Sequence, residues 1–167
     1  VNQFASQYVD DYIKHLKYPK EPKIIHDTLW GTIRLEPWEI AVLDLPLLQR
    51  LRQIRQTSLT NYIFPGCTHT RFDHTLGVIL QTQKLVDAVN ASFPHKEKRP
   101  FDNNAIRDLR LAALFHDCGH SCFSHISENI YRHCQDMRKV IYSNNNDSEF
   151  LGCHPHEVLS ALILRSD

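Results

Sequence analysis

The sequence AIRDLRLAALFHDCGH, residues 105–120, is the most informative stretch of the chain. Apolar side chains recur every three to four positions over 105–115, which predicts a helix. His116 and Asp117 follow that helix directly, and the sequence RFDH occupies residues 71–74 upstream. An imidazole and a carboxylate at one helix end can bind the same ion when another helix supplies a second histidine. The pattern therefore predicts a metal centre.

A His-Asp pair alone needs no metal, because the histidine could be a hydrogen-bonded core residue and the aspartate a surface charge. The surroundings favour the metal, since Gly119, His120 and His125 follow closely and the chain holds 11 histidines in 167 residues. Imidazoles with carboxylates suit Fe, Mn, Ni or Zn. A structural zinc site is the alternative, although its spacing matches no common zinc pattern; it would use Cys118, Cys122, Cys134, His120 and His125.

Composition predicts an ordinary soluble globular domain, with 42% hydrophobic and 23% charged residues. Lys+Arg and Asp+Glu balance at 19 each, so net charge gives no argument for nucleic acid or an anionic membrane. Arg50, Arg52 and Arg55 could contact nucleic acid, but they equally suit one solvated helix face. No stretch has the length of a membrane span. The five cysteines fit reduced thiols, and we expect a cytoplasmic protein.

The fold expected from these patterns is all-α, a compact helical bundle with at most a short β-hairpin near residues 23–35. Residues 1–22 are expected to form an N-terminal arm with a helix over 4–16, and residues 23–167 one domain that continues beyond the C-terminus of this chain. From Pro37 onward, helical periodicity occurs in six segments, one of them the helix at 105–115: Pro37–Leu43, Pro46–Leu59, His74–Ala91, Ala105–Phe115, Ile126–Arg132 and His156–Leu164.

Several side chains near the predicted metal centre suit phosphate chemistry. Arg71 lies one helical turn before His74, and its guanidinium could pair with phosphate oxygens, whereas a surface or ion-paired arginine is the ordinary alternative. Asp73 suits a helix cap. Glu128 lies one turn after His125, and a carboxylate that holds an imidazole makes a usable general acid or base. Gly119 offers a C-terminal cap for the preceding helix.

The ordered motifs resemble those of the HD-domain phosphohydrolases, which carry an H…HD…D pattern, and more closely the deoxynucleoside triphosphate (dNTP) triphosphohydrolases of the SAM-and-HD-domain type. The resemblance extends over roughly residues 23 to 164. It rests on these segments: LQRLR at 48–52, Gln56, FPG at 64–66, His69, RFDHTLGV at 71–78, HDCGH at 116–120 and FSH at 123–125.

The resemblance implies that His74, His116 and Asp117 bind a divalent transition metal, with Mg as a further ion that accompanies the nucleotide. It implies Arg71 on the substrate phosphates and Gln56 near the sugar. In this family a metal-oriented water attacks the α-phosphorus and releases nucleoside and triphosphate. The matching acid–base positions are His120, His125, Glu128 and His156, and we expect His125, oriented by Glu128, to be the acid.

The resemblance also suggests a regulatory site, because four positions match those that hold an activating guanine nucleotide between subunits in some relatives: Lys23, Asp44, Gln49 and Arg52. A homo-oligomer is compatible with this. The family's fourth metal ligand, an aspartate on a later helix, has no counterpart before the chain ends. Two other functions stay open: an HD phosphodiesterase or nucleotidase that acts on another nucleotide, and a catalytically silent module that senses nucleotides.

Overall fold

The computed structural model describes residues 19–95, 99–136, 139 and 152–165. The chain divides into two compact units at the Leu45–Pro46 bond. The helix expected over 4–16 lies outside the described residues. Within the described part, no helix combines the length and apolar character needed to cross a membrane.

The first unit contains a two-stranded hairpin and one helix. Strand β1, Lys23–Asp27, pairs antiparallel with β2, Gly31–Leu35. The turn closes because the Asp27 carboxylate accepts hydrogen bonds from the N–H groups of Leu29 and Trp30, both at 2.8 Å, and Gly31 adopts φ 74°. Helix α2 spans Pro37–Leu43 and starts with a capping box. The predicted hairpin and the predicted bounds of this helix are confirmed.

The second unit starts with helix α3, Pro46–Gln49, which continues as a 3₁₀ turn, η1, over Arg50–Gln53. The helix predicted over Pro46–Leu59 is wrong beyond this point. Ile54 is extended, with φ −108° and ψ 114°, and Arg55 forms a β-bridge with Thr70. Backbone pairing across the loop therefore replaces helical hydrogen bonds, and a second short 3₁₀ turn, η2, follows at Thr60–Tyr62.

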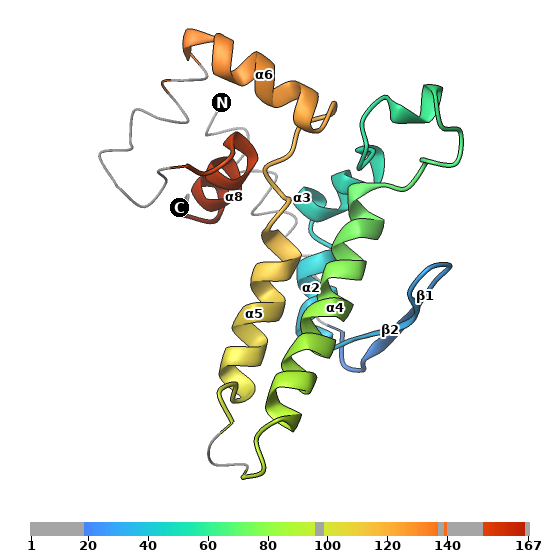
Figure 1. Cartoon of the computed structure of the whole chain (residues 1–167), viewed down its shortest axis with the longest axis vertical. Coiled ribbons are helices and arrows are strands. Elements are labelled where there is room, and N and C mark those ends of the chain that lie inside the picture. The colour runs from blue at the N-terminus through green and yellow to red at the C-terminus, as the bar shows by residue number, and fades with distance from the viewer. Residues whose placement is uncertain (1–18, 96–98, 137–138, 140–151, 166–167) are drawn as a thin grey trace. The chain divides into compact units, whose positions relative to one another are not determined.

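Two long helices form the frame of the second unit. Helix α4 spans Arg71–Ala91 and α5 spans Asn103–Phe115, and they run side by side (Figure 1). Helix α4 begins three residues before the predicted start, because Thr70 and Asp73 form a capping box; Asp73 thus has the structural role expected of it. The buried core of this unit includes Leu48, Leu51, Ile54, Phe72, Leu76, Ile79, Val86, Ala113, Leu114 and Val158.

Two further helices carry side chains of the candidate site. Helix α6 spans His125–His133 and α8 spans Pro155–Arg165, and the two are in contact. Both start close to their predicted positions. The all-α architecture with one short hairpin is therefore confirmed for the described residues.

Candidate metal centre and acid–base cluster

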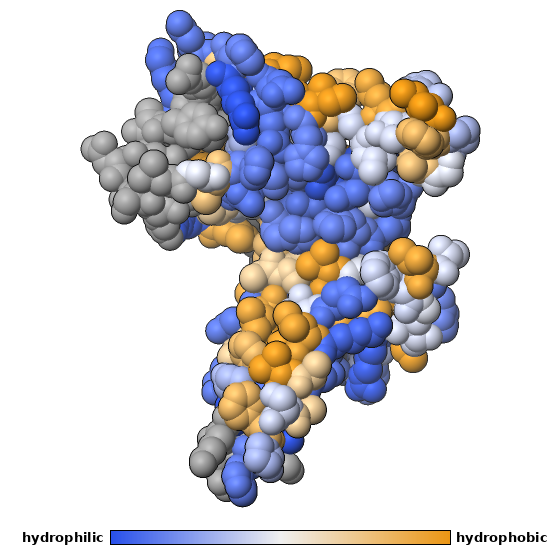
Figure 2. Space-filling view, viewed as in Figure 1, coloured by the Kyte–Doolittle hydropathy of each residue, from blue (hydrophilic) through white to orange (hydrophobic). Residues whose placement is uncertain are grey.

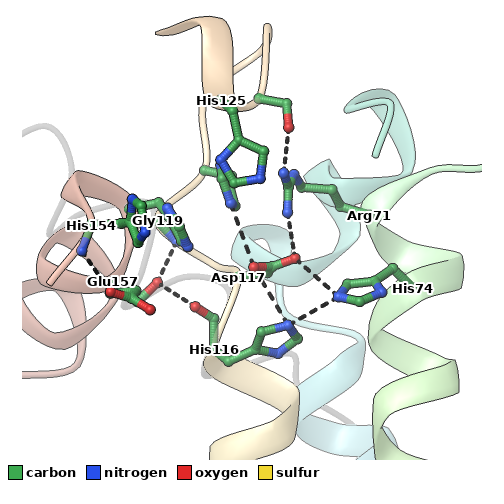
Figure 3. Close-up of polar contacts among 12 residues, drawn as sticks. Arg71, His74, His116, Asp117, Gly119, His125, His154 and Glu157 are labelled. Carbon is green, nitrogen blue, oxygen red and sulfur yellow. Dashed lines mark hydrogen bonds and ion pairs between the residues drawn. The ribbon is translucent and has the colours of Figure 1, made fainter. Parts of the chain in front are cut away.

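Three predicted metal ligands lie together where α5 ends beside α4. The Nε2 atom of His116 lies 3.3 Å from Nε2 of His74 and 3.4 Å from an Asp117 carboxylate oxygen. His74 Nε2 lies 3.7 Å from the other Asp117 oxygen. One ligand atom from each residue falls within 4.8 Å of the other two, and Figure 3 shows the three side chains converging. Asp117 is 3% exposed, so it is not a surface charge.

The hydrogen bonds of this cluster fit a metal. His116 Nδ1 contacts the Ala113 carbonyl oxygen at 2.8 Å, so this nitrogen must carry the proton and donate it. In the neutral ring Nε2 is then a bare lone pair that faces His74 and Asp117, an arrangement that a cation satisfies. Burial, followed by the charges of His116 and Arg71, lowers the pKa of His74 despite the nearby Asp117 carboxylate. A lowered pKa favours the neutral imidazole that metals bind.

Arg71 is buried beside this cluster rather than on the surface. It is 1% exposed, and its Nη1 donates to the Asp117 carboxylate at 2.6 Å (Figure 3). Its Nη2 donates to the hydroxyl of Ser124, while Nε is buried without a hydrogen-bond partner. Burial lowers the pKa of Arg71, an effect that the Asp117 charge opposes. Arg71 is therefore ion-paired, and it also lies beside the predicted metal ligands.

A second cluster gathers around Glu128 on α6. The same carboxylate oxygen accepts a hydrogen bond from Nδ1 of His125 and from Nδ1 of His156, both at 2.7 Å. Burial alone would raise the pKa of Glu128, but these two hydrogen bonds lower it below its usual value. His154, which the sequence analysis did not select, places Nδ1 3.5 Å from the other Glu128 oxygen. The carboxylate therefore orients two imidazoles and keeps its negative charge.

His120 lies between the two clusters. Its Nε2 is 3.5 Å from Asp117 and its Nδ1 is 4.0 Å from Glu128, yet neither nitrogen has a partner with hydrogen-bond geometry. The ring stacks on His156 with centroids 3.8 Å apart. Burial, together with the charges of Arg71, His156 and other histidines, lowers the pKa of His120 to about 2. His120 is thus neutral across the physiological range.

This neutral His120 predicts that acid destabilises the metal-free protein. An unfolded histidine has an ordinary pKa of 6.5, so between pH 6.5 and about 2 the unfolded state binds one more proton than the folded state. Stability is complete above pH 6.5 and decreases as the pH falls below it, by about 2 kcal/mol between pH 7 and pH 5 from this residue. Urea unfolding at both pH values measures the change. In the variant His120→Asn, the free energy of unfolding should depend less steeply on pH. An equal slope in both proteins would show that His120 is not the group responsible.

The turn that carries Asp117 and His120 packs directly against α8. The Ser160 hydroxyl accepts a hydrogen bond from the Gly119 N–H at 2.8 Å and donates to the His116 carbonyl at 3.0 Å. From the other side, Arg50 donates to the carbonyls of Cys118 and His120. Arg50 thus points inward and is not part of a solvated arginine face.

Gly119 is required by this packing and not as the expected helix cap, because α5 ends at Phe115 and His116 is its C-cap residue. A Cβ atom at Gly119 would overlap the His156 carbonyl oxygen and lie 2.5 Å from the Ser160 backbone nitrogen. We predict that Gly119→Ala lowers the free energy of unfolding by about 3 kcal/mol. The matched control is Gly66→Ala, where a Cβ meets nothing within 4 Å. Chemical denaturation compares the two; equal stabilities would show that α8 does not press on the turn.

A cavity of about 660 Å³ opens beside His125. Its polar lining includes Gln56, Thr57 and Ser58, and each of these has a buried side-chain oxygen without a hydrogen-bond partner. Leu59, Ile63 and Ile126 form its apolar part, and Figure 2 shows hydrophobic residues over α6 and over the η2 segment. Hydroxyl and amide groups that lack partners can accept a polar ligand.

The remaining predicted residues are placed as follows. Lys23 and Asp44 are exposed in the first unit. In the second unit Gln49 accepts a hydrogen bond from Arg52 at 2.9 Å, and the Arg52 guanidinium lies 3.6 Å from the centre of the Phe72 ring. A nucleotide site shared by these residues stays a prediction. The alternative zinc site is not assembled, because no group of potential ligands among the described residues contains a cysteine.

Sequence reasoning missed several residues that hold the site together, chiefly Ser124, Ser160 and Arg50. Each acts through a hydrogen bond to a residue distant in sequence, so no local spacing indicates it. Ser124 lies within the FSH motif at residues 123–125, but nothing in that motif predicts its contact with Arg71.

The pattern of the HD domain matches residues 71–166. An uncharacterised protein of Methanocaldococcus jannaschii is 35% identical over 127 residues, which cover 75% of this chain and 25% of that protein. Deoxynucleoside triphosphate triphosphohydrolase SAMHD1 of Homo sapiens is 40% identical over 107 residues, which cover 62% of this chain and 16% of the relative. The chain spans about a quarter or less of the length of these relatives.

Proposed function

The chain belongs to the HD-domain family, and from this premise we propose that it is a metal-dependent phosphohydrolase that hydrolyses dNTPs to deoxynucleoside and triphosphate. The observation that carries the proposal is the position of Arg71. This buried cation lies against Asp117 of the three-ligand cluster and is linked through Ser124 to the loop before His125. A metal, a phosphate-binding cation and an acid–base group are the elements that phosphoryl transfer requires.

In this proposal His74, His116 and Asp117 hold one divalent metal. The metal supplies Lewis-acid polarisation of the phosphate and of the attacking water. Arg71 binds oxygens of the triphosphate, because its guanidinium is a cationic side chain that lies directly against Asp117 of the ligand cluster. Two nitrogen ligands and one carboxylate suit Fe, Mn, Ni or Zn, and Mg²⁺ would enter with the nucleotide.

His125 is the proposed general acid. Water attacks the α-phosphorus, the bond to the 5′-oxygen breaks, and that oxygen takes the bonding electron pair together with a proton from His125. The Glu128 carboxylate stabilises the protonated imidazole through the hydrogen bond to Nδ1, so that Nε2 presents its proton to the substrate. His120 and His156 complete the polar wall beside the phosphates, and Gln56 contacts the sugar from the adjoining cavity.

Product analysis tests the function. The purified protein is loaded separately with Fe²⁺, Mn²⁺, Ni²⁺ or Zn²⁺, mixed with Mg²⁺ and each dNTP, and the products are separated by ion-exchange chromatography. Triphosphate and deoxynucleoside in equal amounts are expected. Release of a nucleoside monophosphate or of inorganic phosphate would instead assign an HD phosphodiesterase or nucleotidase. Nucleotide binding without any product would assign a sensing module.

The same assay tests activation. GTP is added under conditions in which GTP itself is not hydrolysed. It should raise the rate of dNTP hydrolysis if an activating nucleotide is held by Lys23, Asp44, Gln49 and Arg52. Analytical ultracentrifugation with and without GTP then reports whether a homo-oligomer accompanies the activation. An unchanged rate and an unchanged mass would remove the regulatory part of the proposal and leave the catalytic part intact.

A further inference from the structure

Ser124 has a backbone conformation that ordinary residues avoid. Its φ is 53° and its ψ is −132°, and the Ile126 N–H donates to the Phe123 carbonyl at 3.1 Å. These values are those of the second residue of a type II′ turn, a position that strongly favours glycine. A side chain at positive φ is strained, so its retention beside a site requires an explanation.

Helix capping does not explain the serine. Ser124 is the N-cap residue of α6, where a serine hydroxyl normally accepts a hydrogen bond from the first helical turn. Here the hydroxyl makes no such bond. Instead it accepts a hydrogen bond from Nη2 of Arg71 and donates one to the Gln56 carbonyl at 3.2 Å. The side chain is buried, with 1% of the residue exposed.

The hydroxyl therefore joins three segments that carry predicted substrate residues. Gln56 lies in the loop after η1, Arg71 opens α4, and His125 follows Ser124 directly at the start of α6. Without the hydroxyl, Arg71 would keep only the Nη1 contact to Asp117, because its Nε has no partner. A guanidinium held by one hydrogen bond can rotate, whereas two hydrogen bonds fix the plane of the group.

We propose that Ser124 is a positioning residue that orients Arg71 toward the substrate phosphates and fixes the position of its guanidinium relative to His125. Glycine would remove the backbone strain but would not provide the hydroxyl, which accounts for a serine in a glycine conformation. The inference rests on the proposed function for the roles of Arg71 and His125. The contact between Ser124 and Arg71 can be tested without that function.

Two substitutions separate the backbone from the hydroxyl. Ser124→Ala removes the hydroxyl and keeps the strain, and Ser124→Gly removes both. Ser58→Gly serves as a stability reference, because Ser58 is the other described non-glycine residue with positive φ, at 55°. Three quantities are measured for each protein: the thermal midpoint, the dissociation constant for inorganic triphosphate with Mn²⁺ present, and the ¹H–¹⁵N NMR signals of the Arg71 guanidinium.

We expect the affinity for triphosphate to depend on the Ser124 hydroxyl, and the thermal midpoint to depend on the backbone strain at residue 124. The dissociation constant for triphosphate should rise about 10-fold in both Ser124 variants. The thermal midpoint of Ser124→Gly should exceed that of Ser124→Ala by about 3 °C, and Ser58→Gly should show a gain of the same sign over wild type. The Arg71 Nη signals are expected to exchange slowly in the wild type and to disappear in both Ser124 variants.

Other results would overturn the inference. Triphosphate affinity that is lost in Ser124→Ala but intact in Ser124→Gly would assign the effect to the backbone. Arg71 signals that are unchanged in Ser124→Ala would show that the hydroxyl does not hold the guanidinium. If the wild type itself binds no triphosphate, the proposed function fails, and the Arg71 signals alone then decide whether Ser124 positions that side chain.

Discussion

Replacing His116 with alanine should abolish stoichiometric metal binding and reduce the phosphohydrolase rate by about 1,000-fold. His116 Nε2 lies within 3.4 Å of both other ligand residues, so its removal leaves one imidazole and one carboxylate. Its side chain is 34% exposed, and the truncation should therefore cost little stability. The combination of lost metal with a retained fold is the expected result.

Asp117→Ala should also remove the metal, but it should destabilise the chain much more. The Asp117 carboxylate is the buried counter-charge of Arg71 at 2.6 Å, and removing one member of a buried ion pair costs about 3–5 kcal/mol. Asp117→Asn keeps the volume and a hydrogen-bond acceptor for Arg71, so it should lose the metal with a smaller penalty. His116→Ala and Asp117→Ala are thus expected to lose the metal equally but to differ in their free energy of unfolding.

Elemental analysis of the purified variants measures the metal, and circular dichroism with thermal unfolding measures the fold. The matched control is His133→Ala, which removes an exposed histidine of α6 whose Nδ1 contacts the Asn129 carbonyl. This control should keep the wild-type metal content. One metal per chain in both His116→Ala and Asp117→Asn would exclude the three-ligand centre.

Regular periodicity and adjacent residues allowed much of the fold and of the candidate site to be predicted. The helix over Pro37–Leu43 was predicted with its observed bounds, and the start of α4 differed by only three residues. His116 and Asp117 are neighbours in sequence at a helix end, so their proximity followed from local structure. The assignment of His74 as the third metal ligand relied on the family pattern. The hydrophobic periodicity of α4 does not specify which helix packs against it.

Long-range contacts account for what could not be predicted. The apolar spacing of residues 46–59 favours a helix, but the bridge between Arg55 and Thr70 and the hydrogen bond from Arg71 N–H to the Ile54 carbonyl end it. Gly119 carries a usual signal for a helix cap, whereas its actual constraint is the approach of α8, which lies about 40 residues downstream in sequence. Ser124 shows no signal, because neither its positive φ nor its contact with Arg71 is encoded by spacing.

Removing the proposed acid should separate chemistry from metal binding. In His125→Asn we expect full metal content and a fall in the turnover rate on dNTPs of about 100- to 10,000-fold. Glu128→Gln should give a loss in the same range, since a neutral amide cannot stabilise the protonated imidazole, even though its carbonyl oxygen can still accept the hydrogen bonds of His125 and His156. The control is His133→Asn at the other end of α6, which should retain wild-type turnover.

The leaving group identifies the role of His125. A deoxynucleoside leaves as an alkoxide and needs a proton, whereas p-nitrophenolate is stable without one. The His125→Asn variant should therefore hydrolyse p-nitrophenyl triphosphate with a loss of about 10-fold or less, while hydrolysis of dNTPs falls by the full factor. Equal losses on both substrates would mean that His125 positions the phosphates or the attacking water. In that case the acid would be sought between His154 and His156, which lie around the same Glu128 carboxylate.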